Sequence, residues 1–511
     1  MAQEVTKKRL LVFIVAYNAA KTIEGVITRI PQSLGELYDV EVLVIDDCSK
    51  DQTFEASETL RRAEGPPFRL NVLFNPVNQG YGGNQKIGFA FAVEQGFDFV
   101  ALLHGDGQYA PECLPELVKP LADGEAEAVF GSRILRKKGA LKGGMPLYKL
   151  VGNRILTWFQ NKMLHSQLSE FHSGYRVYSV EALRRIPFEL NAQVFHFDTE
   201  IIIQLLFAGL RIKEVPIPTY YGDEICHVNG LKYAWDVAFA TLKARLQKMS
   251  LFYDRKFDCQ PSEQTSERYN LKLGFESSHT LTLAKVRKGA RVLDLGCARG
   301  YLGMELRRRG CYVTGIDLFP LDEGVELDAF YQRNLNTDDL PVPFEDFDHV
   351  LLLDLIEHLL SPEEFVDKLR RACRYSPDMK LIVSTGNVGF VITRLMLLLG
   401  QFNYGRRGIL DLTHTRLFTF RTFCRIFEQA GFEVIETRGI PAPIPLALGD
   451  GRFARLLLAM NRALIRLSKS LFSYQIFIVL KPRPSLPYLL QKANIHSKIR
   501  AEKIDNSSRE T

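Results

Sequence analysis

Short apolar runs, each bounded by turn residues, alternate along the chain with segments of helical periodicity. This alternation is typical of an α/β fold, in which a mostly parallel sheet carries helices on its faces. In the first half of the chain, the pattern predicts strands over residues 10–16, 41–45, 70–74, 99–103 and 128–130.

A second alternating series predicts strands over residues 292–295, 312–316, 350–353, 381–384 and 433–436. The residues between the two series are polar and carry little periodicity. A chain of 511 residues also exceeds what one hydrophobic core usually supports. We therefore expect an N-terminal domain over residues 1–246, a connecting segment over 247–287, a C-terminal domain over 288–482 and a loose polar tail over 483–511.

Charge and composition restrict the partners and the compartment. The formal net charge of +6 is modest for this length and does not indicate a nucleic-acid-binding protein. The eight cysteines are scattered and form no Cys-x-x-Cys pair, which favours reduced thiols in the cytoplasm. No apolar stretch reaches the roughly 18–20 residues that span a bilayer. We expect a cytoplasmic protein that does not bind nucleic acid.

Polar residues gather where the first predicted strands end. Tyr17 and Asn18 end the first strand, Asp46 and Asp47 end the second, and residues 104–108 follow a third. Ligands of open α/β sheets bind at the carboxyl ends of strands. A carboxylate at this edge could hold a divalent cation on a bound pyrophosphate.

The residues at these positions resemble glycosyltransferase family 2, and most of all its dolichyl- and polyprenyl-phosphate sugar synthases. The resemblance rests on residues 16–18, 45–51, 78–84, 106–108, 131–133 and 173–176. It implies a GT-A fold and an inverting sugar transfer, with Asp106 holding Mg or Mn as a catalytic metal ligand and with Arg133 and Arg176 facing phosphates. It also implies that the nucleotide sugar contacts Ala16, Tyr17, Asn18, Asp47, Gly80 and Gln108.

One position departs from the family pattern. His104 stands where the family has the first Asp of its Asp-x-Asp group. An imidazole can ligate a metal ion or bind a phosphate, so His104 is a second candidate metal ligand beside Asp106. A histidine bound only to the protein's own groups is the structural alternative.

The chemistry of the acceptor decides whether the first domain needs a general base. A polyprenyl phosphate is already a nucleophile at neutral pH, whereas a glycan hydroxyl must lose a proton. Asp198 and Glu200 could accept that proton. A stabilising role at the start of a helix is the alternative for both.

The second half of the chain resembles class I S-adenosylmethionine-dependent methyltransferases. A glycine-containing turn at residues 294–300 follows a predicted strand and precedes a helix, and an acid, Asp317, ends the next strand. Ala298 replaces the glycine most common in that family. The resemblance implies a Rossmann-like domain that binds S-adenosylmethionine through Asp294, Gly296, Cys297, Gly300, Asp317 and Asp354.

Two further segments could serve the methyl acceptor. Residues 354–358 resemble a group that binds metal in quinone-pathway O-methyltransferases, through Asp354, Glu357 and His358, although a role at a helix start is the plainer interpretation. Residues 408–418 could line an acceptor pocket or make structural hydrogen bonds.

Residues 453–471 alternate Arg and Lys with Leu, Ile and Phe. This pattern predicts a basic amphipathic helix that either lies on an anionic membrane or docks onto its own domain. Together the two resemblances predict a bifunctional enzyme of bacterial cell-surface glycan assembly, peripheral on the inner face of the plasma membrane, with a lipid-linked or glycan acceptor. The alternative is one catalytic half, joined to a degenerate half that acts as a scaffold or binds lipid.

Overall fold

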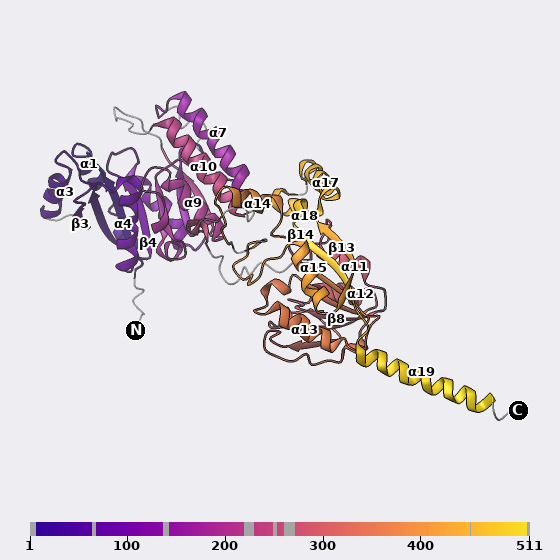
Figure 1. The fold of residues 1–511 in the computed structure, drawn as a ribbon. Helices are drawn as coiled ribbons and strands as arrows, with labels where there is room; N and C mark the ends of the chain where they lie inside the picture. Colours follow the sequence, from indigo (N-terminus) through magenta and orange to yellow (C-terminus); the bar gives the residue numbers. More distant parts are fainter. Residues whose placement is uncertain are drawn as a thin grey trace, which may run out of the picture. The chain divides into compact units, whose positions relative to one another are not determined.

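The computed structural model of the chain divides into two compact units, residues 1–266 and 267–511 (Figure 1). Each unit contains one seven-stranded sheet with helices packed against it. The predicted α/β class is therefore confirmed for both halves of the chain. The structure describes residues 7–63, 68–135, 143–218, 229–248, 253–259, 271–405, 407–449 and 451–507.

The sheet of the first unit has a parallel part and a mixed part, in the order β3-β2-β1-β4-β6-β5-β7. The first four strands of that order are parallel: β3 (Arg69–Phe74), β2 (Asp39–Asp46), β1 (Arg9–Ala16) and β4 (Phe99–His104). β6 (Arg176–Ser179) then runs antiparallel to both of its neighbours, β4 and β5 (Ala128–Ser132), and β7 (Ile212–Pro216) is parallel to β5.

Helices cover both faces of this sheet, and β1 shows why the sequence folds this way. Leu11 and Phe13 of β1 pack into one core cluster, whereas Leu10, Val12 and Ile14 pack into a second cluster on the opposite face. Successive side chains of a strand point to opposite faces, so a continuous apolar run fits a strand that is buried on both sides. The helices of the first unit that matter below are α1 (Ile23–Thr28), α4 (Gly80–Glu94), α7 (Leu147–Leu164), α9 (Phe197–Phe207) and α10 (Gly230–Lys248).

The sheet of the second unit has the order β10-β9-β8-β11-β12-β14-β13. The first five strands of that order are parallel: β10 (Ala329–Gln332), β9 (Tyr312–Asp317), β8 (Arg291–Leu295), β11 (His349–Leu353) and β12 (Lys380–Gly386). β14 (Gln475–Pro482) lies between β12 and β13 (Phe432–Ile440) and is antiparallel to both. The helices of this unit include α11 (Ser278–Lys285), α12 (Tyr301–Arg308), α13 (Pro362–Ala372), α14 (Val391–Leu398), α15 (Phe420–Gln429) and α17 (Arg452–Leu467).

The structure contains each of the ten predicted strands, extended by a few residues at most at either end. Four strands, β6, β7, β10 and β14, lie outside the ten predicted ones. β6 and β10 have only four residues each, which is too short for a clear apolar pattern. β14 follows a helical segment and is antiparallel to both of its neighbours, whereas the pattern predicted a mostly parallel sheet. Residues 483–511, predicted to form a loose polar tail, contain the helix α19 (Leu486–Ser507) instead. Leu486, Leu489 and Leu490 fall at helical spacing near its start, and all three are exposed.

The division at Ser266 and Glu267 falls inside the predicted connecting segment, of which residues 249–252 and 260–270 lie outside the described residues. No disulfide joins the cysteines that the structure describes. Among the described residues, no helix has both the length and the apolar character needed to cross a membrane.

The packing of α4 on β1 gives a test of the first unit. A Cβ atom added at Gly88 would lie 2.2 Å from the Phe13 ring, which is buried in the core. We expect Gly88→Ala to lower the free energy of unfolding of this unit by about 1–3 kcal/mol through overpacking. Both tryptophans of the chain, Trp158 and Trp235, lie in this unit, so tryptophan fluorescence during urea denaturation reports its unfolding.

Gly25→Ala in α1 is the matched control. A Cβ atom added there has no neighbour within 4 Å, so this change should leave stability unaltered or raise it by up to about 1 kcal/mol. Equal urea midpoints for Gly88→Ala and the wild type would contradict the packing of α4 on β1.

Candidate functional site

The carboxyl ends of β1, β2 and β4 bring the predicted nucleotide-sugar residues together, because β1 lies between the other two strands. Two hydrogen bonds link the turns after β1 and β2: the Asn18 N–H donates to Ser49 Oγ (2.8 Å), and the Lys50 N–H donates to Asn18 Oδ1 (2.9 Å). The turn after β4 joins them through the Gly105 N–H, which donates to the Val15 carbonyl (2.9 Å). Tyr17 is exposed beside this junction, whereas Ala16 is buried.

Asp47 is buried and fixes the segment that leads into α4. Its Oδ1 accepts hydrogen bonds from Asn75 Nδ2 and the Gln79 N–H (both 2.8 Å), and its Oδ2 accepts from the Gly80 N–H (2.9 Å). These contacts satisfy backbone donors at the helix start that have no partner within the helix. The predicted contact of Asp47 and Gly80 with a nucleotide stays a prediction, and any N–H or O–H of a nucleotide that donates to Asp47 would share it with these internal donors.

The neighbouring Asp46 was not among the predicted ligands. Its Oδ1 accepts from the Ser49 N–H (2.8 Å), but its Oδ2 is buried without a hydrogen-bond partner among the described residues. Burial raises the pKa of Asp46. Its place beside Asp47 at the end of β2 is the only sequence signal for it.

His104, at the end of β4, lies between two tyrosine rings, with ring centroids 5.4 Å from Tyr81 and 5.0 Å from Tyr109. Its Nε2 is 3.2 Å from the Tyr81 hydroxyl, which donates to Asp198 Oδ2 (3.0 Å). These partners assign the tautomer: Nε2 carries the proton and donates to the tyrosine oxygen, and Nδ1 keeps a lone pair. Burial lowers the pKa of His104, so the neutral form is favoured.

The structure also explains why glycine occupies position 174. A Cβ atom added at Gly174 would lie 2.6 Å from His104 Cε1 and 3.0 Å from the Tyr81 hydroxyl. The imidazole therefore packs directly on the main chain of the segment that leads into β6.

The metal roles predicted for Asp106 and His104 stay predictions. Asp106 is half-buried, and its Oδ1 accepts from the Gln108 N–H (3.0 Å). Among the described residues, no group of three or more His, Cys, Asp or Glu side chains could hold a metal ion. The donor set fits a cation that keeps most of its ligands from water and from a bound pyrophosphate, as Mg²⁺ does at nucleotide sites.

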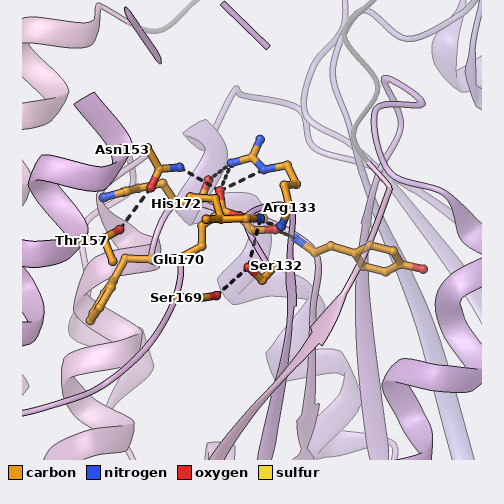
Figure 2. Close-up of polar contacts among 12 residues, drawn as sticks. Ser132, Arg133, Asn153, Thr157, Ser169, Glu170 and His172 are labelled. Carbon is orange, nitrogen blue, oxygen red and sulfur yellow. Dashed lines mark hydrogen bonds and ion pairs between the residues drawn. The ribbon is translucent and has the colours of Figure 1, made fainter. Parts of the chain in front are cut away.

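Arg133 is held in a buried cluster with Glu170 (Figure 2). The Arg133 N–H donates to Glu170 Oε2 (2.8 Å), and Arg133 Nε donates to Oε1 (3.0 Å). Asn153 Nδ2 donates to the same Oε1 (2.8 Å), and Arg133 Nη2 donates to the His172 carbonyl (2.9 Å). Burial opposes ionisation of Glu170, but the charge and hydrogen bonds of Arg133 outweigh it and keep the pKa of Glu170 below its ordinary value.

Arg176 is more deeply buried than Arg133, with 1% of its surface exposed. Its guanidinium donates to three main-chain carbonyls, those of Ser173 (2.8 Å), Asp198 (2.9 Å) and Phe171 (3.0 Å). Its Nη1 also lies 3.4 Å from Asp198 Oδ1. In this geometry Arg176 positions the surrounding segments. Its contact with a phosphate stays a prediction that the burial does not favour.

The two carboxylates considered as general bases are both held by protein donors. Asp198 accepts from Tyr81, as described, and Glu200 accepts from Lys256 Nζ (2.8 Å) and from the Ala192 N–H (2.6 Å). Both lie in the first turn of α9, but neither makes a side-chain cap of that helix.

In the second unit, the turn after β8 contains three residues with left-handed backbone angles. Gly296, Ala298 and Gly300 all have left-handed backbone angles, with φ of 74°, 49° and 82°. Asp317, at the end of β9, holds this turn: its Oδ2 accepts from the Ala298 N–H (2.7 Å), and its Oδ1 accepts from the Phe319 N–H (2.9 Å). Each oxygen keeps a second lone pair that can accept from a ribose hydroxyl.

Two buried carboxylates, Asp294 at the end of β8 and Asp317 at the end of β9, lie beside this turn, and the Cys297 thiol lies in it. Burial, followed by the charge of Asp317, raises the pKa of Asp294 to about 7. Burial also raises the pKa of Cys297 far above its ordinary value, so this residue is a neutral thiol. A cationic ligand beside Asp294 would favour the ionised carboxylate, which fits the positive charge of S-adenosylmethionine.

Both carboxylate oxygens of Asp354 accept hydrogen bonds from neighbouring strands. Its Oδ1 accepts from Ser384 Oγ (2.8 Å), and its Oδ2 accepts from Gln475 Nε2 (2.8 Å), which connects the end of β11 to β12 and β14. Its role in cofactor binding stays a prediction. Glu357 nearby is buried, and desolvation and then the charge of Asp354 raise its pKa to about 8.

The structure brings together two segments that the sequence singled out separately. His358 follows β11, and its ring centroid is 4.7 Å from that of His414 in the 408–418 segment. The Thr415 N–H donates to the Glu357 carbonyl (2.8 Å), which holds that segment over the end of β11. The sequence did not indicate that His414 lies beside His358, because the two residues are far apart along the chain.

Comparisons with known proteins now place both units. The family model described as glycosyl transferase family 2 matches residues 11–186. Undecaprenyl-phosphate mannosyltransferase of Micrococcus luteus is 31% identical over 218 residues, which cover 41% of this chain and 82% of that protein. The chain belongs to glycosyl transferase family 2. A second relative of this glycosyltransferase, UDP-N-acetylglucosamine–dolichyl-phosphate N-acetylglucosaminyltransferase of Methanococcus voltae, is 30% identical over 42% of this chain and 87% of its own length.

The second unit carries a methyltransferase domain, because a family model of that description matches residues 269–437. The recognition of a family 2 glycosyltransferase joined to a methyltransferase is thereby confirmed, and the chain is an enzyme. Among solved structures, glucosyl-3-phosphoglycerate synthase of Mycobacterium tuberculosis resembles the glycosyltransferase unit at 21% identity and a TM-score of 0.35, over 46% of this chain and 80% of that one.

The raised pKa of Asp294 predicts a pH dependence of the methyltransferase unit. Between the ordinary carboxyl pKa of 3.8 and about 7, the unfolded chain is ionised at this residue while the folded chain keeps the proton. Stability therefore falls as pH rises through this window, by up to about 1.4 kcal/mol per pH unit, and the effect levels off above pH 7. Asp294→Asn should remove this contribution, so its melting temperature should fall less than that of the wild type between pH 5 and 7.5.

Scanning calorimetry without ligands measures the melting temperature of the methyltransferase unit. Its unfolding transition is identified as the one that tryptophan fluorescence does not follow, since both tryptophans lie in the other unit. The exposed Asp339 supplies the control, and Asp339→Asn should keep the pH response of the wild type. Identical pH responses of Asp294→Asn and the wild type would show that Asp294 ionises normally in the folded protein.

Proposed function

We propose that the chain is a bifunctional transferase of bacterial cell-surface glycan assembly. Its glycosyltransferase unit moves a sugar, with inversion, from a nucleotide sugar to a polyprenyl phosphate or a surface glycan. Its methyltransferase unit moves a methyl group from S-adenosylmethionine to a product or partner of the same assembly. The observation that carries this proposal is that each of two separate sheets gathers ligand-type side chains at the carboxyl ends of its parallel strands.

For the sugar donor, Asp106 is the half-buried carboxylate at this edge, and we assign it to a divalent cation, Mg or Mn. His104 would add its Nδ1 lone pair to that cation or to a phosphate oxygen. A bound cation would neutralise the charge of the departing nucleoside diphosphate. The exposed Tyr17, together with Asn18, would contact the nucleotide beside this group.

For the acceptor, a lipid phosphate suits the site better than a sugar hydroxyl, because the candidate general bases of the site are already engaged. A phosphate oxygen attacks without losing a proton, so no general base is required. The two candidate bases, Asp198 and Glu200, already accept from Tyr81 and Lys256. Two relatives are named as enzymes of undecaprenyl phosphate and dolichyl phosphate, which supports the same class of acceptor here.

In the methyltransferase unit, the residues act mainly by binding and orienting S-adenosylmethionine. Asp317 would accept from the ribose hydroxyls while it holds the turn through the Ala298 N–H. Asp294 would lie near the cationic part of the cofactor. S-adenosylmethionine supplies the methyl group itself, and the pair His358 and His414 lies at the same edge of the sheet, where an acceptor could approach.

A second candidate function keeps only one half catalytic and makes the other a scaffold or a lipid-binding module. The observation in its favour is His104, whose Nε2 is already bound to Tyr81 in the position where the family has a carboxylate. The two predictions that follow distinguish the candidates, because each tests one unit while the other serves as its control.

Asp106→Ala should abolish sugar transfer to a short-chain polyprenyl phosphate, because the cation would lose its carboxylate ligand. S-adenosylmethionine affinity should not change, since the two sites lie on separate sheets. Radiolabelled sugar transfer and titration calorimetry on the same preparation measure both. Undiminished transfer by Asp106→Ala would remove Asp106 from the metal role, and transfer absent even from the wild type would support the single-catalyst alternative.

Asp317→Ala should weaken S-adenosylmethionine binding by about 1–3 kcal/mol, the effect of losing hydrogen bonds to a charged group. Asp317→Asn separates this loss from a disturbed turn, because an amide oxygen can still accept one of the two backbone hydrogen bonds. Sugar transfer should be unaffected in both variants. Equal affinity of wild type and Asp317→Ala would refute the ribose assignment.

A further inference from the structure

Two helices of the glycosyltransferase unit, α7 and α10, pack against each other and form one continuous outer layer (Figure 1). Each buries one side: Leu150 and Leu164 point inward from α7, and Val237 and Ala244 point inward from α10. Their opposite sides are turned to solvent.

The outward sides of these helices are apolar to an unusual degree. Both tryptophans of the chain lie there, with 68% of Trp158 and 72% of Trp235 exposed. Exposed apolar side chains at helical spacing surround them, and together they define the α7–α10 face: Leu147, Tyr148, Val151, Ile155, Trp158, Leu231, Trp235, Phe239 and Leu242. A contiguous exposed apolar surface of this kind marks a site of interaction.

The charges of the two helices that carry the α7–α10 face are almost all positive. Asp236 is the only acidic residue in either helix, and every other charged residue is Lys or Arg. Arg154 and Lys162 of α7 and Lys232 of α10 are exposed cations among or beside these apolar side chains.

The inner sides of the same helices are tied to the predicted phosphate site. Asn153 of α7 donates to Glu170, the carboxylate that holds Arg133 (Figure 2). Tyr233 of α10 lies 2.8 Å, hydroxyl to Nδ1, from His172, whose carbonyl accepts from Arg133. One hydrogen-bonded layer therefore separates the α7–α10 face from the Arg133 cluster.

We propose that the α7–α10 face docks the enzyme onto an anionic lipid bilayer. Exposed tryptophan and tyrosine rings suit the interface between head groups and acyl chains, and cations around an apolar patch are attracted to anionic lipids. A second copy of the chain is disfavoured as the occupant, because two such faces would bring like charges together. If the proposed acceptor is a polyprenyl phosphate, this docking surface would present the Arg133 side of the unit to the lipid in which the acceptor is embedded.

This surface differs from the helix that the sequence suggested for membrane contact. α17 exposes Phe453, Leu456 and Met460, but Arg462 makes an ion pair with Glu276 (3.1 Å) and Leu458 is buried against its own unit. The α7–α10 face and α17 lie in different units, and only the former contains tryptophan.

Tryptophan emission gives a direct test on the full chain. Vesicles of phosphatidylglycerol and phosphatidylcholine should shift the emission of the wild type to shorter wavelength, because both rings would leave water for the interface. Raised salt should weaken the binding by screening the surrounding cations. Vesicles that sediment with the protein without any change in emission would overturn the proposal, since the contact would then lie away from both tryptophans.

The double variant Ile155→Asp with Phe239→Asp places two carboxylates on the α7–α10 face and keeps both tryptophans. Its vesicle affinity should fall at least tenfold, with an unchanged urea transition in tryptophan fluorescence. Leu37→Asp is the matched control, because Leu37 is 63% exposed in the same unit, against 60% for Ile155 and 58% for Phe239. Unchanged vesicle binding by the double variant would refute the proposal, as would a wild-type dimer that the double variant converts to monomer.

Two further measurements separate this proposal from others. A variant with Arg455, Arg462 and Arg466 changed to Glu should keep the emission shift, and loss of the shift there would assign the contact to α17 instead. The double variant should transfer sugar normally to a detergent-free short-chain polyprenyl phosphate but poorly to a long-chain acceptor in vesicles. Absence of transfer from the wild type in both assays would reject the proposed function, whereas the emission test would still decide the docking surface.

Discussion

One buried guanidinium holds together the parts of the glycosyltransferase site. Arg176 donates to three main-chain carbonyls and pairs with Asp198, which accepts from Tyr81, which in turn accepts from His104. Four elements, β6, α9, α4 and β4, meet in this network. A charge this deeply buried is tolerated only when all its donors are satisfied, so the positions of these elements depend on one another.

The sequence predicted the parallel strands and the edge at which they would gather polar residues, because both follow from local patterns. It could not tell a side chain that faces a ligand from one that faces the protein. Arg176 and Asp354 occupy motif positions, yet Ser173, Phe171, Ser384 and Gln475 engage their polar atoms. Those partners are set by tertiary packing.

The sequence missed Glu170, and it indicated His414 only as part of the 408–418 segment. Each is brought to its site by a hydrogen bond between distant parts of the chain, from Arg133 to Glu170 for the first and from Thr415 to Glu357 for the second. The short strand β6 escaped detection for the same reason, since its pairing with β4 and β5 supplies what its four residues lack in pattern.

The hydrogen bonds of Asp47 have a consequence for how a nucleotide would be received. Because both carboxylate oxygens hold the segment of Gln79 and Gly80, this segment is ordered by the protein alone. A ligand that meets an ordered loop loses little additional conformational entropy in the receptor, and a rigid loop distinguishes ligands by shape. A nucleotide would then bind at this edge to a preformed site, without closure of the segment of Gln79 and Gly80. Any motion in the catalytic cycle would have to come from elsewhere in the unit.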